Sequence, residues 1–238
     1  MKIAVLGDIH GNIDALKAAY DRAVGEDAQK VFHLGDLGGY APFVNEVVDF
    51  LIEHKIDGVQ GNYDDAVANG KEHCGCRYVD PLQARMSSLS FEWTKTHASQ
   101  RSKDYMRSLP FELCLSSNGV TVKLFHATPF KNNLYWHEDR DDRFFTDMGR
   151  RAGADVIIYG HTHIPYIKKI GGKTFINAGS VGKPKDKDPR ACFALIEITA
   201  PGLKIDFIRV PYDVEETASA VLESGLPPCF ADNLRQAE

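Results

Sequence analysis

Six short apolar runs that end in polar residues constrain the fold of this chain more than any other feature of its sequence. Each run spreads β-branched or apolar residues over four to six positions, the pattern of a buried strand, and then closes on Asp, Asn or His, often after Gly. The runs are KIAVLGD (2–8), KVFHLGD (30–36), DGVQGN (57–62), VKLFH (122–126), DVIIYGHTH (155–163) and KTFINAGS (173–180). Because ligands bind beyond the carboxyl ends of the strands in open α/β sheets, we predict that these polar residues gather at one edge of a sheet.

Amphipathic helices are expected between the first strands. Residues 12–24 carry apolar side chains at helical spacing, with Asn12 as the predicted N-cap. Residues 42–55 show a similar spacing behind a Pro, a residue favoured in the first turn of a helix. Strands that alternate with such helices predict an α/β core.

The middle of the chain interrupts this alternation. Residues 66–110 are interpreted as mostly helical, whereas residues 112–126 and 191–212 each predict a β-hairpin. A chain of 238 residues can form one large core, and we find neither a repeat nor a linker that divides it. We therefore predict a single domain, residues 1–238, with a mostly helical insertion at about 66–110.

Composition narrows the expected partners and location. The net charge of −5 argues against a long nucleic-acid partner, which needs a clustered basic face. The basic stretch 182–190 is interpreted as a solvated loop because its Asp residues offset its Lys residues. Five Cys without a four-ligand zinc pattern predict a reduced, cytoplasmic protein. No signal-peptide pattern and no run of about 18 apolar residues occurs, so no membrane partner is expected.

Polar residues at or just past the strand ends predict a metal site. They are Asp8, His10, Asp36, Asn62, His126, His161 and His163. Carboxylate, imidazole and amide oxygen are ligands for first-row divalent metals, and residues two apart in a strand point to the same side. These residues would crowd one metal, whereas two metals that share a bridging Asp would leave room for water. By contrast, we expect His33, inside the second run, to pack within the sheet.

Six ordered motifs resemble those of the calcineurin-like metallophosphoesterases, and most closely the small bacterial phosphodiesterase branch. The motifs are GDIHGN (7–12), GDLGGY (35–40), GNYD (61–64), FHATP (125–129), GHTH (160–163) and NAGSVG (177–182). The resemblance implies a four-layer α/β/β/α sandwich of two mixed sheets, with a dinuclear metal site at one edge.

The resemblance also divides the ligands between two metal ions. One ion would be held by Asp8, His10 and His163, and the other by Asn62, His126 and His161, with Asp36 as the bridge. Such N/O sites suit Mn, Fe, Zn or Ni, as divalent or trivalent ions. Two such ions lower the pKa of a shared water, so that hydroxide attacks the phosphorus in line with the departing oxygen.

Further residues are expected to act on the substrate. Asn12 matches a position near the substrate phosphate, Tyr40 could reach the substrate or cover the site, and Arg190 could pair with a phosphate. Tyr63 stands where the family usually has a His that assists the leaving group, and Asp64 matches the acid that usually braces that His. Because a phenol is a much weaker acid than imidazolium, Tyr63 would act by hydrogen bonding or would only pack beside the site.

We therefore predict a hydrolase for phosphodiester or nucleotide-type small molecules. One alternative is hydrolysis of dinucleotide polyphosphates of the diadenosine tetraphosphate type. A second, from another class, is a non-catalytic metal-binding scaffold, since the retromer subunit resembles this family. Tyr135 and Trp136 could form a wall that stacks a nucleobase, or an ordinary packed loop.

Overall fold

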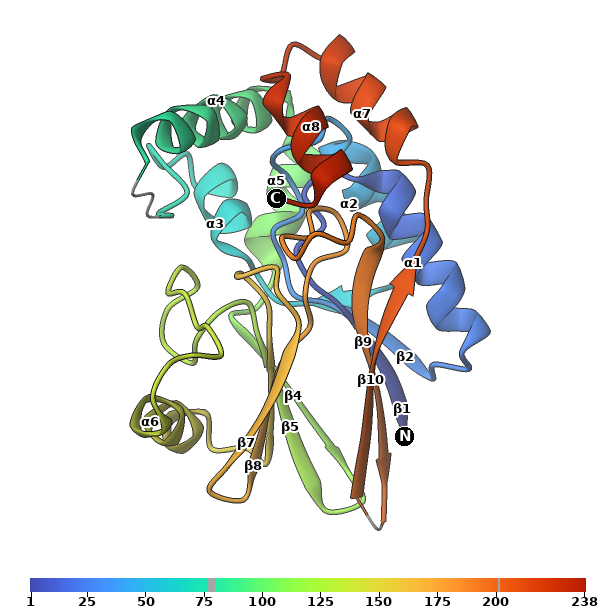
Figure 1. The fold of residues 1–238 in the computed structure, drawn as a ribbon, viewed down its shortest axis with the longest axis vertical. Helices are drawn as coiled ribbons and strands as arrows, with labels where there is room; N and C mark the ends of the chain where they lie inside the picture. The colour runs from blue at the N-terminus through green and yellow to red at the C-terminus, as the bar shows by residue number, and fades with distance from the viewer. Residues whose placement is uncertain (77–79, 201) are drawn as a thin grey trace.

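The computed structural model describes residues 1–76, 80–200 and 202–238, and these residues form two mixed sheets of five strands each (Figure 1). The first sheet has the spatial order β10 (Gly202–Val210), β9 (Ala191–Thr199), β1 (Lys2–Leu6), β2 (Lys30–His33) and β3 (Asp57–Gly58). β1, β2 and β3 are parallel to one another, whereas β9 is antiparallel to both of its neighbours. The first three apolar runs therefore end at the same edge of this sheet.

The second sheet repeats this arrangement with the other three runs. Its order is β4 (Glu112–Ser117), β5 (Val120–Phe125), β6 (Val156–Tyr159), β8 (Lys173–Asn177) and β7 (Tyr166–Ile170). β5, β6 and β8 are parallel, and the two edge strands are antiparallel. Both predicted hairpins are present, and the first turns through Asn118 and Gly119 at positive φ, as an Asn-Gly turn requires.

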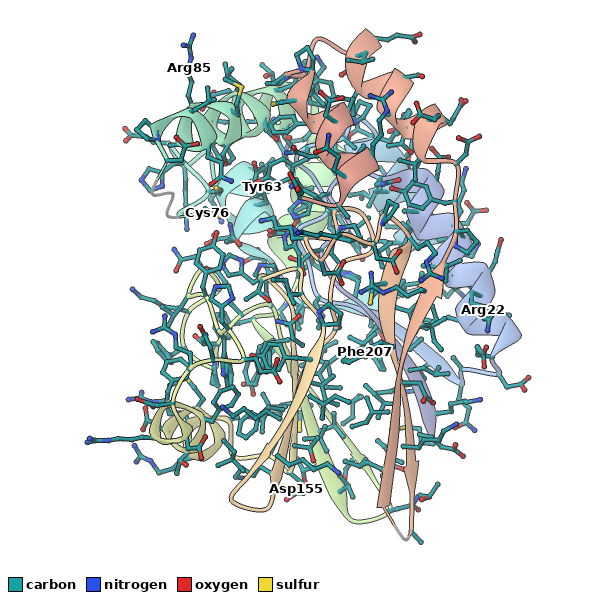
Figure 2. The ribbon with its side chains drawn as sticks, viewed as in Figure 1. Arg22, Tyr63, Cys76, Arg85, Asp155 and Phe207 are labelled. Atoms are coloured by element: carbon teal, nitrogen blue, oxygen red, sulfur yellow. The ribbon has the colours of Figure 1, made fainter. Side chains whose placement is uncertain are left out.

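Helices cover the outer faces of the paired sheets. α1 (Ile13–Gly25), α2 (Val44–Glu53), α7 (Val214–Glu223) and α8 (Cys229–Gln236) share an apolar cluster with the first sheet, and α6 (Asp142–Ala152) packs on the second. A separate apolar cluster fills the space between the sheets, where Figure 2 shows Phe207. The layers therefore follow the order helix, sheet, sheet, helix, and the predicted α/β/β/α sandwich is confirmed.

The run DGVQGN departs from the predicted strand. Its β structure is limited to β3, and Asn62 is the first residue of α3 (Asn62–Ala68) rather than the end of a strand. The Asp64 carboxylate accepts a hydrogen bond from the Gly61 N–H at 2.8 Å and so closes the start of this helix. Gly61 is needed because a Cβ there would lie 2.2 Å from Asp36 Oδ1. A helix start, not a strand end, sets the position of Asn62.

The region expected to be helical continues with α4 (Pro81–His97) and α5 (Gln100–Ser108), while residues 77–79 lie outside the described part. α3 and α4 lie over the site edge of the sheets (Figure 1). Besides α3, the elements α6, β7 and α8 were not anticipated from the sequence. None of the described helices is both long and apolar enough to cross a membrane.

Candidate metal centre

The carboxyl ends of the parallel strands of both sheets meet at one edge of the sandwich. One group there consists of Asp8, His10 and His163, and a second of Asp36, His126 and His161; within each group the ligand atoms lie within 4.8 Å of one another. Asn62 joins the second group, with its Oδ1 2.9 Å from His126 Nε2. Figure 2 shows Tyr63, which follows Asn62, at this edge below α4, far from Asp155 at the opposite end.

Asp36 lies between the two groups. Its Oδ2 is 3.8 Å from His10 Nε2, and its Oδ1 is 3.5 Å from His126 Nε2. One carboxylate oxygen therefore faces each group. This is the geometry expected of a residue that bridges two cations.

Main-chain carbonyls orient three of the imidazoles. The Nδ1 atoms of His10, His126 and His163 lie 2.9, 2.7 and 2.6 Å from the main-chain oxygens of Gly38, Leu34 and Lys183, respectively. Because a carbonyl only accepts, each Nδ1 carries the proton, and the Nε2 lone pair points into the site. Histidine ligands of metals are commonly oriented in this way.

The same geometry leaves nitrogen lone pairs facing one another. His10 Nε2 lies 3.2 Å from His163 Nε2, and neither nitrogen has a proton to donate when both Nδ1 atoms are protonated. Among the described residues, the buried atoms Asp8 Oδ1 and His161 Nε2 have no hydrogen-bond partner. Buried groups without partners are costly, and a cation in each group would satisfy them. The oxygen and nitrogen donors fit a first-row divalent metal.

Burial shifts the pKa values of these side chains toward their neutral forms. Burial raises the pKa of Asp8 to about 7, an effect that the His126 charge opposes and the Asp36 charge reinforces. Burial and the neighbouring Asp64 raise the pKa of Asp36 well above its usual range. Burial lowers the pKa of His10, His161 and His163 well below the usual value. These three imidazoles are thus in the unprotonated form that binds metals, and a nearby cation would favour ionised carboxylates.

Five of these residues adopt a left-handed backbone conformation that is uncommon outside Gly. Their φ values are 48° for Asp8, 50° for His10, 52° for Asp36, 67° for His161 and 64° for His163. Asp and His tolerate this region better than most residues do, but such conformations cluster at functional sites. The tight turns after the strands are what aim these side chains at the common edge.

Asp64 and Tyr63 both lie beside the metal centre. The Asp64 carboxylate accepts hydrogen bonds from the main-chain N–H groups of Asp36, Leu37 and Gly61 at 2.8–2.9 Å, so it supports the Asp36 loop rather than the residue at 63. The buried Tyr63 hydroxyl donates to Ser90 Oγ on α4 at 3.4 Å, while its ring lies edge-on to His10. The structure thus connects Tyr63 with α4 and with His10 through packing.

Asn12 was expected near the substrate phosphate, but its side chain bonds to other parts of the chain. Asn12 is the N-cap of α1; its Nδ2 donates to Gly182 O and Tyr212 OH, and its Oδ1 accepts from Ala15 N–H. This side chain therefore has no free group for the expected phosphate contact.

Arg190 lies at the surface, whereas Tyr40 lies at the metal centre. Within the described part of the chain, the hydrogen bonds of the Arg190 guanidinium go to Asp188 at the surface, and none links it to the metal centre. Tyr40 lies at the centre, where its ring meets that of His10 edge-on at 4.9 Å.

Several residues outside the ligand set border the centre. Asn62 Nδ2 donates to Cys76 Sγ at 3.3 Å, and Figure 2 shows Cys76 near the same edge. Lys185, in the stretch interpreted as a solvated loop, is close enough for its charge to act on the titration of the centre. The Tyr135 ring stacks on His161 at 4.4 Å, whereas Trp136 is buried against Tyr159. Of the two aromatic residues, only Tyr135 borders the centre.

Comparisons with known proteins agree with this geometry. The calcineurin-like phosphoesterase superfamily domain matches residues 1–200. A relative from Methanocaldococcus jannaschii, the uncharacterized protein MJ0912, is 28% identical, with 98% of this chain and 96% of the relative covered. A metallophosphoesterase structure from Sphaerobacter thermophilus has a TM-score of 0.78 at 26% identity, with both chains fully covered. The hypothetical protein PH1004 from Pyrococcus horikoshii has a TM-score of 0.83 at 22% identity, covering 100% of this chain and 98% of its own, and shares the fold.

The chain belongs to the calcineurin-like phosphoesterase superfamily. Its family, together with the similar Sphaerobacter structure, identifies it as a phosphoesterase with residue groups that could hold metal ions.

Proposed function

We propose that this protein is a two-metal hydrolase that cleaves a phosphoester bond in a small phosphodiester or nucleotide-type molecule. One ion would be held by Asp8, His10 and His163, and the other by Asn62, His126 and His161. Asp36 would contribute one carboxylate oxygen to each ion. The position of Asp36 carries this proposal, since its two oxygens face the two groups at 3.8 and 3.5 Å.

The donor set suits Mn, Fe, Zn or Ni. When bound, two such ions supply Lewis acidity: they lower the pKa of water at the site and neutralise charge on phosphorus-bound oxygens. The chain itself keeps the imidazoles oriented through main-chain carbonyls and holds the Asp36 loop through Asp64. The donor groups are therefore positioned before any substrate arrives.

The position of Tyr63 bears on the choice of substrate. Its hydroxyl is buried and bonded to Ser90, and burial raises its pKa well above the usual value, so it is a poor proton donor to a departing oxygen. We therefore propose that the enzyme acts fastest on esters whose leaving group needs little proton assistance. Nitrophenyl esters should exceed alkyl esters of the same phosphate.

Metal analysis combined with a hydrolysis screen tests the function. Protein freed of metal and then saturated separately with Mn, Fe, Zn or Ni should bind two ions per chain and hydrolyse bis(4-nitrophenyl) phosphate. Asp36→Asn should reduce both metal content and turnover, whereas Lys204→Met, an exposed change distant in sequence, should alter neither. Saturation at one ion per chain, or full turnover in Asp36→Asn, would contradict the two-metal proposal.

A further inference from the structure

A cleft of about 290 Å³ lies between α4, α8 and the loop that follows β8. Its lining includes Tyr40, Leu82, Met86, Lys183, Lys185 and Phe230. This volume is close to the lower end of the range for small-molecule sites. The cleft is therefore large enough to receive part of a small ligand.

Two of the lining residues contact imidazoles of the metal centre. The Tyr40 ring lies edge-on to the His10 ring, with the ring centroids 4.9 Å apart. The Lys183 main-chain oxygen accepts the hydrogen bond that His163 Nδ1 donates, at 2.6 Å. A phosphoester held at the centre thus has this cleft as its immediate neighbour.

Lys185 supplies a positive charge where the cleft meets the centre. Lys185 lines the cleft together with Tyr40 and Lys183, the two residues that contact imidazoles of the centre. Within the described residues, no hydrogen bond holds the Lys185 ammonium. Lys183 differs, because its ammonium donates to the Glu238 main-chain oxygen at 2.6 Å. Lys185 is therefore the lysine of this pair that is available to an anion.

The remaining walls combine apolar and polar side chains. Leu82, on α4, is 63% exposed and lines the cleft. Met86 follows one turn later, and on the α8 side Phe230 meets the Tyr40 ring edge-on at 5.1 Å. The lining also holds the amide side chains of Gln83 and Asn233 and the carboxyl side chains of Asp80 and Glu238. Apolar side chains together with a few polar groups suit a flat organic group that has polar edges.

On the basis of the proposed two-metal function, we propose that this cleft binds the organic part of the substrate and that Lys185 binds its phosphate. The substrate class would be a phosphoester with a planar, nucleobase-like group. A small alkyl phosphoester would leave the Leu82 and Met86 wall in contact with water. Lys185 would contact the phosphate of nucleotide-like and alkyl esters alike, whereas the Leu82 and Met86 wall would contact only a planar organic group. The phosphate contact and the wall can therefore be tested separately.

The test uses calorimetric binding of adenosine 5′-monophosphate and of inorganic phosphate to the metal-loaded protein. Lys185→Met should weaken both ligands, on the order of tenfold or more, because a charge-assisted contact is lost. Its control is Lys187→Met, an exposed lysine of the same loop that is absent from the cleft lining; it should change neither affinity more than about twofold.

The wall is tested by the double change Leu82→Ala with Met86→Ala. Adenosine monophosphate should bind about threefold to tenfold more weakly, whereas phosphate affinity should stay the same. Leu89→Ala, a partly exposed residue of the same helix outside the cleft lining, is the control. Thermal melting of each variant verifies that it is folded.

The outcomes separate the cleft from the proposed function. Unchanged phosphate affinity in Lys185→Met, or equal losses of both ligands in the wall variant, would overturn the cleft assignment. Wild-type protein that hydrolyses bis(4-nitrophenyl) phosphate but binds adenosine monophosphate no more tightly than phosphate would overturn the cleft assignment alone. Protein that binds the nucleotide through the cleft but hydrolyses no ester would overturn the two-metal function and support the cleft.

Discussion

Replacement of Tyr63 by Phe tests whether this residue takes part in catalysis or only in packing. The change removes one hydroxyl and leaves the buried ring, which contacts His10, Tyr40 and Phe91. The hydroxyl donates to Ser90 Oγ at 3.4 Å, which is long for a bond between two hydroxyl groups. The structure therefore predicts a small effect on stability and almost none on turnover.

The magnitude follows from the kind of bond that is lost. A neutral hydrogen bond contributes about 0.5–1.5 kcal/mol, and a long one belongs at the lower end of that range. For a chain of this size, the loss should lower Tm by roughly 1–4 °C. General-acid assistance is worth about 10²–10⁴ in rate, so a catalytic hydroxyl and a packing hydroxyl predict clearly different kinetics.

The assay measures kcat/KM for phosphodiesters with leaving groups of different pKa, in wild type and in Tyr63→Phe. We expect the same slope against leaving-group pKa in both, with rates within about threefold. Ser90→Ala is the matched variant; it also removes the acceptor of the Tyr40 N–H at 2.8 Å, so it should destabilise by about 1–3 kcal/mol more. If Tyr63→Phe slowed alkyl esters about a hundredfold while nitrophenyl esters were unaffected, the hydroxyl would have to reach the leaving group, and the packing interpretation would be refuted.

Three further predictions concern the metals and the core. Asp36→Asn should lower the metal content at both groups and reduce kcat more than Asn62→Ala, because Asn62 is a ligand in one group only. Metal analysis and turnover of the two variants check this prediction. Equal effects of the two changes would count against Asp36 as a bridge. Removal of metal by a chelator should lower the free energy of unfolding by about 4 kcal/mol for each ion held, and so by about 8 kcal/mol for two ions, relative to protein with free metal at 1,000 times Kd. Denaturant titration measures this loss, and identical curves would mean that no ion is held. Burial lowers the pKa of His33 to about 3. Below about pH 6.5 the folded state therefore binds fewer protons than the unfolded state, and the free energy of unfolding decreases as the pH falls. At pH 5 this amounts to about 2 kcal/mol, and His33→Gln should flatten the dependence by one proton between about pH 6.5 and 3, whereas parallel curves would place the imidazole in contact with water.

The sequence alone predicted the α/β class, both hairpins and the grouping of the polar strand ends. These features follow from local patterns, because buried strands and amphipathic helices have different periods of apolar residues. Parallel strands also bring their carboxyl ends to one edge of a sheet. Asp8 and His163 follow strands of different sheets, and their grouping around one ion was implied by the resemblance to the family. His33 was likewise expected to pack within the sheet, and it is fully buried in β2.

Elements with weaker patterns were missed. α6 begins with a charged segment and is capped by Asp141, and β7 is an edge strand of mixed polarity. α8 has only eight residues, too few for its apolar spacing to stand out. Such segments form because residues of neighbouring layers cover their apolar side chains. These covering residues are distant in the sequence, so the local pattern does not reveal them.

The tertiary structure decided which polar groups remain free for chemistry. Asn12 was expected near the substrate phosphate, Asp64 as the brace of residue 63, and Tyr63 either as a hydrogen-bond donor or as a packing residue. In the structure the polar groups of all three bond to other parts of the chain. Lys185, by contrast, was interpreted as part of a solvated loop and lies beside the centre. A residue's type and its place in a motif indicate which hydrogen bonds its side chain can form. Its partners, however, come from distant parts of the sequence through packing. Only the folded chain therefore determines which of its donors and acceptors are already used.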